Sequence, residues 1–512
     1  MVQDAMTTKT INISTNPLNG KEYPMPESNN DKLGIDAFIE KNKGKQVVIV
    51  QGLGFVGAVM SLVCANALTE EYAVIGVDLA RKDTFWKIKS INEGVFPVIA
   101  SDPKIEIFYQ NAMKKGNLYA TYDSYAYSLA DVIIVDINLD VQKKSDFYKD
   151  LEGYDVDLTG FKRAMKAIGD NCKEDVLVLV ETTVPPGTSQ KIVKPIIEDC
   201  LKSRGLTTER LKLGHSYERV MPGPDYIDSI QNFYRVYSGI DEHSADATEL
   251  FLKTIISTEK YPLSRLGNTN ATEMAKVLEN SYRAMNIAFA VEWSRFAEES
   301  GVNFYEVVNA IRLRPTHANL MYPGIGVGGY CLTKDPLLAS WSRQNLFGSN
   351  EPLGQSERGV QINDKMPLYS FNFLKKTYQQ DLKDKKVLLL GVSYRSDVGD
   401  TRYTPVEPLY DYLKAAEATI LVQDPYVSFW EEIDIPVAAT YDEYFKQELD
   451  VIVFSTGHRE YKNNKDLIKL IISQKNVFVL DTIGILSESE INQINARHTA
   501  RVVGRGDIQM SK

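Results

Sequence analysis

The chain has 512 residues, of which 44% are hydrophobic and 25% charged, and its formal net charge is −10. This length exceeds what one hydrophobic core usually holds, so we expect two or three domains. The acidic balance argues against a nucleic-acid partner, which normally requires a basic surface. No apolar run reaches the roughly 18 residues that a membrane span needs, and the start of the chain lacks the apolar segment of a secretory signal. We therefore expect a cytoplasmic protein with no membrane partner.

The cysteines and histidines give little support for a zinc site. Four cysteines lie far apart without a CxxC pair, and five histidines form no HxxxH pair. We expect reduced thiols and no metal. The first 44 residues are polar, and we interpret residues 1–44 as a loosely ordered N-terminal extension.

The first ordered region has the pattern of a strand, a tight turn and a helix. Residues 45–50 form a buried-strand pattern, three glycines follow within residues 52–57, and residues 58–68 form an apolar helical run. A second strand pattern, residues 73–77, ends at Asp78, the offset at which a Rossmann unit places its ribose-binding acid. The glycines allow close approach of a pyrophosphate to a helix N-terminus. We therefore predict dinucleotide binding, with Asp78 favouring NAD because it would repel the 2′-phosphate of NADP.

Further patterns predict an α/β fold with two Rossmann-like, doubly wound domains joined by a long central helix and helical region. The other strands are expected at residues 132–135, 176–180, 386–390, 419–422, 451–454 and 477–480. The long helix covers residues 270–299 without Pro or Gly, and a second helical run ends near residue 312. The predicted divisions are the extension at 1–44, an NAD-binding domain at 45–240, a central helical region at 241–381, and a second Rossmann-like domain at 382–512.

The long helix carries a stripe of polar side chains. Spacings of three, four and three place on one helical face Glu273, Lys276, Asn280 and Arg283. Apolar residues elsewhere on the helix are expected to belong to the core: Val277, Leu278, Met285 and Phe289. A polar stripe is usually a solvated surface, but the loop that follows favours a functional interpretation.

That loop, residues 323–336, is rich in glycine and contains the lone thiol of Cys331, which is followed closely by Lys334 and Asp335. Glycines let a backbone wrap closely around a ligand. A lone cysteine is usually an inert, small hydrophobic residue. After two glycines and near Lys334, however, its thiolate is favoured and its sulfur is exposed. We interpret Cys331 as a nucleophile.

Together these motifs resemble the UDP-glucose/GDP-mannose dehydrogenase family, from about residue 45 to near the C-terminus. The matching segments are residues 52–57, Lys276 with Asn280, residues 328–335 and residues 391–405. The resemblance implies NAD-dependent oxidation of the C6 hydroxymethyl of a UDP-sugar to a carboxylate, through a thiohemiacetal and a thioester on cysteine. It also implies that residues 382–512 bind the UDP-sugar and that the long helix is buried in a homodimer or larger homo-oligomer.

The resemblance assigns roles to individual residues. The catalytic residues would be Cys331, Lys276, Asn280, Asp335 and Glu181. The residues that contact NAD would be Gly52, Leu53, Gly54, Phe55, Val56, Gly57, Asp78, Arg81, Thr183, Lys334 and Arg402. The residues that contact the substrate would be Arg219, Val220, Lys276, Asn280, Arg283, Arg314, His317, Asn319, Gly324, Gly328 and Arg395.

Some residues depart from the family pattern. Leu139 stands where a threonine is usual, Arg395 where a lysine is usual, and His317 where an arginine reaching across the dimer is expected. Residues 181–188, residues 218–223 and Arg283 favour the N-acetylhexosamine branch, whereas Lys334 resembles the glucose branch. The alternatives are a UDP-glucose 6-dehydrogenase, a two-electron hydroxyacid dehydrogenase of the 6-phosphogluconate type, and a nonenzymatic NAD-binding protein of the same fold.

Overall fold

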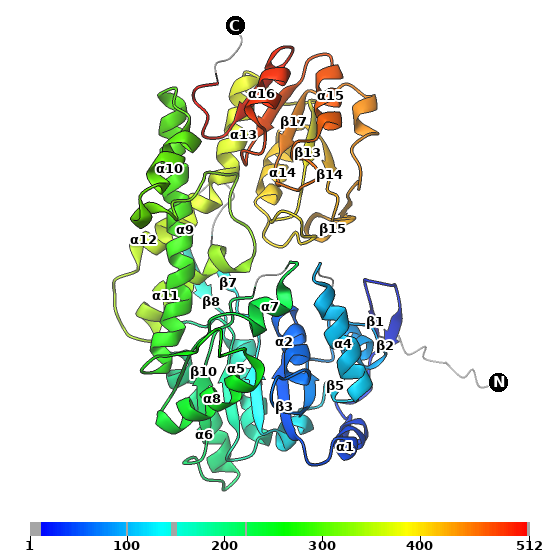
Figure 1. Cartoon of the computed structure of the whole chain (residues 1–512), viewed down its shortest axis with the longest axis vertical. Coiled ribbons are helices and arrows are strands. Elements are labelled where there is room, and N and C mark those ends of the chain that lie inside the picture. The colour runs from blue at the N-terminus through cyan, green and yellow to red at the C-terminus, as the bar shows by residue number, and fades with distance from the viewer. Residues whose placement is uncertain (1–11, 99–100, 145–150, 221–222, 509–512) are drawn as a thin grey trace, which may run out of the picture. The chain divides into compact units, whose positions relative to one another are not determined.

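The computed structural model describes residues 12–98, 101–144, 151–220 and 223–508 (Figure 1). The chain divides into two compact units. Unit 1 comprises Met1–Asp140 and Val156–Lys276, and unit 2 comprises Val141–Asp155 and Val277–Lys512. The boundary expected after residue 240 lies inside unit 1. Among the described residues, no helix is both long and apolar enough to cross a membrane.

Unit 1 is built on an eight-stranded sheet with the order β12-β11-β10-β9-β6-β3-β4-β5. The strands are β3 (Gln46–Gln51), β4 (Tyr72–Val77), β5 (Leu118–Thr121), β6 (Val132–Val135), β9 (Leu177–Val180), β10 (Lys212–His215), β11 (Val236–Gly239) and β12 (Ser264–Arg265). They run parallel from β5 to β10, and β11 is antiparallel to β10. The next strand in the chain, β4, lies on one side of β3, and the later strand β6 lies on the other side. The carboxyl ends of β3 and β6 therefore form a switch point, where α/β sheets bind their ligands.

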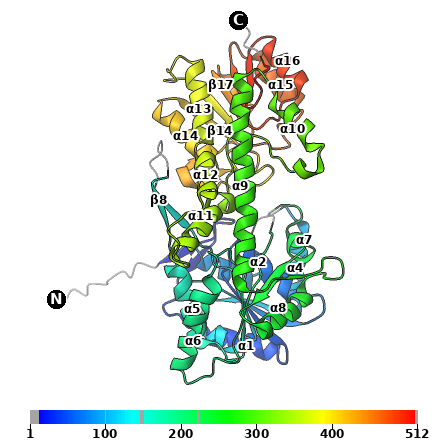
Figure 2. The same cartoon turned by 90° about the vertical axis from the view of Figure 1, so that its left-hand side faces the viewer.

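The helices of unit 1 cover this sheet, and α5 and α6 lie side by side in both views (Figures 1 and 2). They are α2 (Phe55–Ala65), α3 (Phe85–Asn92), α4 (Pro103–Lys115), η1 (Ser124–Leu129), α5 (Thr159–Asn171), η2 (Ser189–Val193), α6 (Lys194–Ser203), α7 (Tyr226–Gln231) and α8 (Glu242–Ile255). Helix α2 begins three residues before the expected start. Gly54 is its N-cap, so the glycine turn leads directly into the helix.

The N-terminal segment corrects one expectation, because residues 12–44 are folded onto unit 1. They form β1 (Ile13–Thr15), β2 (Glu22–Pro24) and α1 (Lys32–Lys41). Ile35 and Phe38 of α1 are buried, and the Phe38 ring stacks on Tyr119 of β5 with centroids 5.6 Å apart. A loosely ordered extension is therefore wrong for these residues. The polar composition concealed a short amphipathic helix and buried polar side chains.

Unit 2 contains helices and a β-hairpin. In the sequence, the hairpin lies between the two segments that make up unit 1. The helical elements are α9 (Thr269–Glu299), which begins in unit 1, and α10 (Phe304–Arg312), η3 (Pro315–His317), α11 (Tyr330–Asn345), α12 (Gly354–Asp364) and α13 (Met366–Thr377). The hairpin pairs β7 (Val141–Lys144) with β8 (Gly153–Val156). It is attached to α12 through an ion pair of Lys143 with Asp364 at 2.7 Å.

The C-terminal part of unit 2 is a parallel sheet with the order β14-β13-β17-β18-β19. Its strands are β13 (Lys386–Leu390), β14 (Thr419–Gln423), β17 (Val451–Phe454), β18 (Phe478–Asp481) and β19 (Thr499–Val502), with helices α14 (Val406–Ala415), α15 (Lys465–Ser473) and α16 (Glu488–Asn495). The remaining short elements are β15 (Phe429–Trp430), η4 (Glu431–Ile433), β16 (Ile435–Pro436) and η5 (Tyr444–Lys446). Val387 and Leu389 face one apolar cluster, and Leu388 and Leu390 face another. A sheet with a core on both faces confirms the predicted pair of doubly wound domains.

Helix α9 runs as one continuous helix (Figure 2) and corrects a second expectation about the core. Val277 is buried and Met285 half-buried, but Leu278 is 63% and Phe289 54% exposed. The assignment of Leu278 and Phe289 to the core is wrong. They belong to an exposed apolar stripe along α9, which we define as Leu278, Tyr282, Phe289, Trp293 and Phe296.

The first prediction tests whether α1 is part of the folded protein. Replacing Phe38 with Ala should lower the free energy of unfolding of unit 1 by about 3 kcal/mol, because a buried aromatic contact is lost. Leu33→Ala on the same helix is the matched control, since Leu33 is 88% exposed, and its effect should stay within about 0.5 kcal/mol. Calorimetric unfolding measures both variants. Equal effects would mean that α1 does not contribute to the core.

Candidate active site

The glycine turn after β3 requires glycine at two of its three glycine positions. Gly52 has a φ of +98°, and a Cβ there would lie 2.3 Å from the Asp136 carbonyl oxygen. A Cβ on Gly57 would lie 1.9 Å from the Gly52 carbonyl oxygen. A Cβ on Gly54, in contrast, would meet nothing within 4 Å. The turn thus leaves open space at the N-terminus of α2, where backbone N–H groups favour a phosphate.

Asp78 lies at the end of β4 and faces the same turn. Its Oδ2 accepts the Leu53 N–H at 3.0 Å and its Oδ1 accepts the Leu79 N–H at 2.7 Å. Desolvation raises the pKa of Asp78, opposed by these two hydrogen bonds. Arg81, three residues on, is exposed and pairs with Asp83 at 2.7 Å. An acid at this position beside an open glycine turn fits the ribose and pyrophosphate of NAD.

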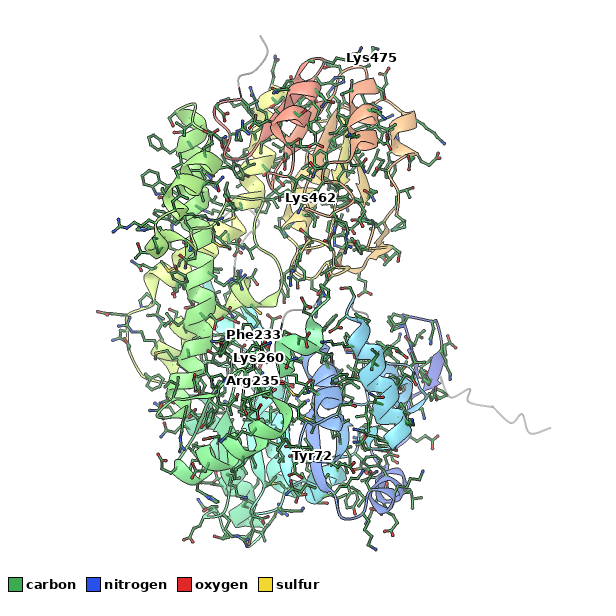
Figure 3. All side chains as sticks on the ribbon, viewed as in Figure 1. Tyr72, Phe233, Arg235, Lys260, Lys462 and Lys475 are labelled. Atoms are coloured by element: carbon green, nitrogen blue, oxygen red, sulfur yellow. The ribbon has the colours of Figure 1, made fainter. Side chains whose placement is uncertain are left out.

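Buried charges follow the carboxyl ends of β6 and β9. The Glu181 carboxylate is fully buried and accepts a hydrogen bond from the Arg235 guanidinium. Arg235, which is labelled in Figure 3, lies just before β11. Glu181 Oε2 and Asp136 Oδ2 are buried with no hydrogen-bond partner. Burial raises the pKa of both carboxyl groups, and the negative charge of Glu181 raises that of Asp136 further. Sequence analysis missed Arg235, whose only signal was a cation directly before an apolar strand.

Lys276 lies close to the segment that follows β10. Its Nζ donates to the Glu218 carbonyl oxygen at 2.8 Å, and the Glu218 carboxylate lies 3.8 Å away. Lys276 is 5.5 Å and the Arg219 guanidinium 5.3 Å from the centroid of the Tyr217 ring. Two predicted substrate-binding cations therefore gather on one aromatic ring. Of the loop expected at residues 218–223, Met221 and Pro222 lie outside the described residues.

Glu273 has a structural contact that the stripe pattern did not reveal. The carboxylate is fully buried and accepts the N–H groups of Gly187 at 2.6 Å and Ser189 at 2.8 Å. Burial raises its pKa to about 7. Glu273 thus ties the first turns of α9 to the turn after β9. The first three members of the stripe are buried, whereas Arg283 is exposed.

Unit 2 carries the thiol. Cys331 is exposed at the second position of α11, whereas Cys64, Cys172 and Cys200 are buried. A helix N-terminus stabilises a thiolate, which is the form of cysteine that attacks electrophiles.

The loop before the thiol packs closely against the segment from residue 391 to 405. A Cβ on Gly328 would lie 2.5 Å from the Tyr403 carbonyl oxygen, and Gly329 donates its N–H to the Arg402 carbonyl oxygen at 3.3 Å. The structure therefore brings two predicted motifs together. Asn363 of α12, which sequence analysis missed, holds the same loop by exchanging two hydrogen bonds with Val327, at 2.7 and 3.0 Å.

Asp335 joins two other predicted residues. Its fully buried carboxylate accepts a hydrogen bond from Asn280 Nδ2 at 2.6 Å and lies 3.2 Å from Lys334 Nζ. Lys334, expected at the cofactor, is thus paired with Asp335. Arg402, also expected there, pairs with Asp400 through two hydrogen bonds at 2.9 and 2.5 Å.

The remaining predicted residues are more dispersed. Five of them are exposed, namely Arg283 on α9, Arg314, His317 and Asn319 after α10, and Arg395. None of the described contacts joins these five to Asn280 or Asp335. Three others are half-buried, namely Val56, Thr183 and Val220. Phe55 is 37% exposed. Gly324 lines a cavity of 230 Å³ together with Arg312 and Tyr322.

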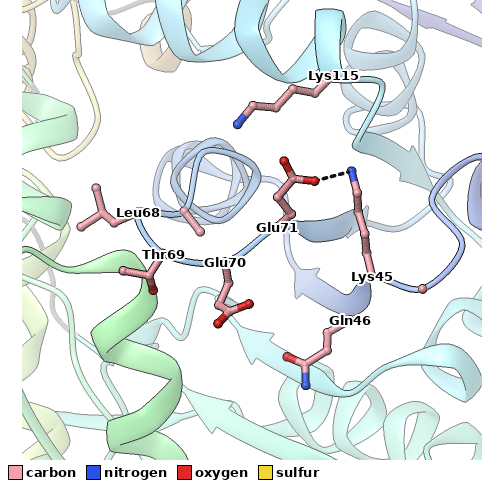
Figure 4. Close-up of a pocket in the computed structure, with 9 residues that line it drawn as sticks. Lys45, Gln46, Leu68, Thr69, Glu70, Glu71 and Lys115 are labelled. Atoms are coloured by element: carbon pink, nitrogen blue, oxygen red, sulfur yellow. Dashed lines mark ion pairs between the residues drawn. The ribbon is translucent and has the colours of Figure 1, made fainter.

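A wide hollow of 720 Å³ in unit 1 lies at the wrong edge of the sheet for this chemistry (Figure 4). It is lined by residues just before β3 and β4, including Lys45 and Glu71, which form an ion pair at 3.3 Å. Nucleotide sites of α/β sheets lie at the carboxyl ends of the strands. The hollow is therefore not part of the candidate active site.

One group of possible metal ligands occurs among the described residues, namely Asp397, His458 and Glu460. His458 Nδ1 already accepts the Asp397 N–H at 2.9 Å, and its Nε2 faces Asp424 at 3.0 Å. Both ring nitrogens are engaged within the protein, so this group carries no metal assignment.

Comparison with known proteins identifies the family. Three family domains match in order: the NAD-binding domain over residues 46–255, the central domain over 270–363 and the UDP-binding domain over 388–488. The chain belongs to the UDP-glucose/GDP-mannose dehydrogenase family. It is an NAD-dependent oxidoreductase, as the glycine turn and Asp78 indicated.

Several relatives cover nearly the whole chain. A UDP-N-acetyl-D-mannosamine dehydrogenase from Methanocaldococcus jannaschii is 31% identical, covering 88% of this chain and 95% of its own. An NDP-N-acetyl-D-galactosaminuronic acid dehydrogenase from Methanosarcina mazei superposes with a TM-score of 0.75 at 25% identity, covering 93% and 99%. A UDP-D-ManNAc dehydrogenase from Pyrococcus horikoshii gives a TM-score of 0.74 at 27% identity, covering 90% and 100%.

Leu139, which departs from the family pattern, is 2% exposed. The Thr182 hydroxyl, which follows β9, donates a hydrogen bond to the Val135 carbonyl oxygen at the end of β6, at 3.1 Å.

The second prediction concerns the buried pair of Glu181 and Arg235. Arg235→Met should lower the free energy of unfolding by about 3–5 kcal/mol, because it leaves the Glu181 charge buried without its partner. Adding Glu181→Gln removes that charge, so the double variant should be more stable than Arg235→Met alone. Calorimetric unfolding of both variants, with Glu181→Gln as the control, makes the comparison. A double variant no more stable than the single one would contradict the charge argument.

Proposed function

We propose that the protein oxidises the C6 hydroxymethyl group of a UDP-N-acetylhexosamine, the GlcNAc or ManNAc form, to the uronic acid. The observation that carries the proposal is the exposed Cys331 thiol at the N-terminus of α11. A two-electron hydroxyacid dehydrogenase has no use for such a thiol, whereas a four-electron oxidation requires a nucleophile.

The first oxidation removes a proton from the C6 hydroxyl and a hydride from C6. NAD, when bound, accepts the hydride in each of the two oxidations. Lys276, with Asn280 and a water held by Asp335, takes the proton and stabilises the oxygen as negative charge develops on it. The hydrogen bond between Asn280 and Asp335, at 2.6 Å, supports this role because it fixes both groups before substrate binds.

The second oxidation passes through Cys331. Its thiolate adds to the aldehyde carbon, a C–S bond forms, and the oxygen takes up a proton to give a thiohemiacetal. Loss of a proton from oxygen and of a hydride from carbon then gives a thioester. Water cleaves the C–S bond, releasing the carboxylate and the thiol. The whole reaction therefore consumes one water and two NAD for each sugar.

The substrate class rests on the relatives and on local charge. Two of the relatives described above act on N-acetylmannosamine nucleotides by name, and a third on an N-acetylgalactosamine derivative. A diphosphate needs local cations in a chain of net charge −10. Arg219, Arg283 and Arg395 are the cations we assign to the sugar and diphosphate.

We also propose a homodimer formed through the stripe on α9. Five large apolar side chains between 47% and 63% exposed follow one helical face there. Monomeric proteins rarely expose a contiguous apolar surface of this kind, and interfaces are enriched in Trp, Tyr and Phe. A second copy of α9 presents the same aromatic stripe and so complements it.

A cytoplasmic location fits the thiols. All four cysteines are among the described residues, and none of them is in a disulfide bond. Reducing compartments keep cysteines in the thiol form, and the reaction needs Cys331 in that form.

The third prediction tests the reaction. With NAD and a panel of UDP-GlcNAc, UDP-ManNAc and UDP-glucose, we expect an N-acetylated sugar to be preferred and to give two NADH for each carboxylate, followed by absorbance and mass spectrometry. Cys331→Ala should lower uronic acid formation by about three or more orders of magnitude while NAD still binds. Cys200→Ala is the control for loss of a thiol elsewhere.

The possible failures are distinguishable. Preference for UDP-glucose would overturn the substrate class and leave the reaction intact. Uronic acid formation by Cys331→Ala near the parental rate would overturn the covalent mechanism. One NADH for each sugar, with an aldehyde product, would make the protein a two-electron enzyme.

The fourth prediction tests the dimer. Trp293→Glu places a charge in the middle of the stripe and should convert the dimer to a monomer at micromolar concentration, measured by sedimentation. Glu292→Lys, an exposed neighbour off the stripe, should leave the dimer intact. A monomeric parent protein would contradict the proposal.

A further inference from the structure

The N-terminal segment, residues 12–44, lies outside the matched NAD-binding domain, which begins at residue 46. Its hairpin, β1 with β2, packs against α3. Helix α1 packs against β5 at the edge of the sheet (Figure 1). Helix α3 follows the loop that begins at Asp78, and β5 is the strand next to β4. Residues 12–44 therefore contact both elements next to Asp78, namely α3 and β5.

Ser14 of β1 caps α3 from outside the helix. Its fully buried Oγ accepts the Trp86 N–H at 3.0 Å and donates to the Lys82 carbonyl oxygen at 2.7 Å. Trp86 is the second residue of α3, and such N–H groups have no partner within their own helix. Thr84, the N-cap residue, does not cap α3, because its Oγ1 donates to the Leu79 carbonyl oxygen at 2.6 Å. The loop over residues 79–84 is therefore closed by Thr84 and held at its far end by Ser14.

A second buried contact fixes the body of α3. Asn16 Nδ2 donates to Ser90 Oγ at 2.9 Å, and both residues are fully buried. At the end of α3, Lys21 forms an ion pair with Glu93 at 2.6 Å, and Tyr23 donates to the same carboxylate at 3.0 Å. The hairpin is docked along the whole helix rather than at one point.

Asp31, just before α1, forms hydrogen bonds with β5, the other element next to Asp78. Its carboxylate accepts hydrogen bonds from Thr121 Oγ1 at 2.7 Å and Tyr119 at 2.9 Å. The Thr121 carbonyl oxygen in turn accepts the Asp78 N–H at 3.1 Å. Asp31 therefore holds the strand end to which Asp78 is bonded.

We propose that residues 12–44 position the adenosine-ribose end of the NAD site, with Ser14 and Asp31 as positioning residues that hold the loop carrying Asp78 and Arg81. An ordered loop binds the ribose without the entropy cost of fixing it at the moment of binding. The inference concerns NAD binding by unit 1 and does not depend on which sugar is oxidised.

The fifth prediction tests this with Ser14→Ala, which removes the external cap. We expect the Kd for ADP-ribose, measured by calorimetry, to rise about fivefold, the effect that loss of a helix cap has on an equilibrium. The KM for NAD should rise by a similar factor with kcat unchanged. Binding of nicotinamide mononucleotide, which has no adenosine, should not change. Asn16→Ala should act in the same direction, and it decides the question if Ser14→Ala does not fold.

The matched control is Asn42→Ala in the same segment. Asn42 is buried and donates to the Phe38 and Gly116 carbonyl oxygens, at the amino end of β5 and away from Asp78. It should lower stability while leaving the Kd for ADP-ribose unchanged within twofold. An unchanged Kd in Ser14→Ala would overturn the proposal. An equal rise in Asn42→Ala would also overturn it, because the effect would then be general destabilisation.

Discussion

In unit 1 the position of the ribose-binding acid relative to the glycine turn depends on a direct hydrogen bond, donated by the Leu53 N–H to Asp78 at 3.0 Å. It exists because Gly52 takes a left-handed conformation that other residues rarely adopt. The bond ties the end of β4 to the turn after β3. The open space at Gly54 and the acid for the ribose are therefore fixed relative to one another before NAD binds.

The second Rossmann-like sheet has an equivalent hydrogen bond, but there the acid also bonds to further groups of the protein. Val392 donates its N–H to Asp424 at 2.8 Å, after a glycine with a φ of +94°. The same carboxylate oxygen also accepts from the Ser393 N–H at 3.1 Å and faces His458 Nε2 at 3.0 Å, and all three side chains are buried. The hydrogen bond with His458 holds the pKa of Asp424 below its usual value against desolvation. Asp424 is engaged within the protein, whereas Asp78 keeps a partly exposed edge, so of these two acids Asp78 is the one suited to the adenosine ribose of NAD. Two hydride transfers would then use one NAD site in succession.

Local patterns predicted the parts of this fold that local physics determines. The strands at Lys386–Leu390 and Val451–Phe454 have the expected bounds, because continuous apolar runs between polar turns allow few alternatives. The local pattern did not separate the exposed stripe on α9 from the core, since an apolar helix face has the same spacing in both cases. Only the family resemblance implied that this helix lies at a subunit interface. The hairpin of residues 12–24 was missed because its anchors, Ser14 and Asn16, are polar residues that become buried only through partners about 70 positions away.

Glycines, a thiol and the family resemblance marked much of the site, but its buried ion pair was only half recognised. Arg235 and Glu181 come from segments 54 residues apart, and Glu181 belongs to a segment that resembles the family whereas Arg235 carries no motif of its own. Replacing such a buried pair by apolar residues often raises stability, so stability alone does not explain it. Glu181 Oε2 and Asp136 Oδ2 add a further cost, because each is buried without a hydrogen-bond partner. Both residues follow the carboxyl ends of neighbouring strands, β6 and β9, the end of the sheet at which α/β proteins bind their ligands. The stability lost to buried charge is therefore concentrated at the same end of the sheet as the glycine turn.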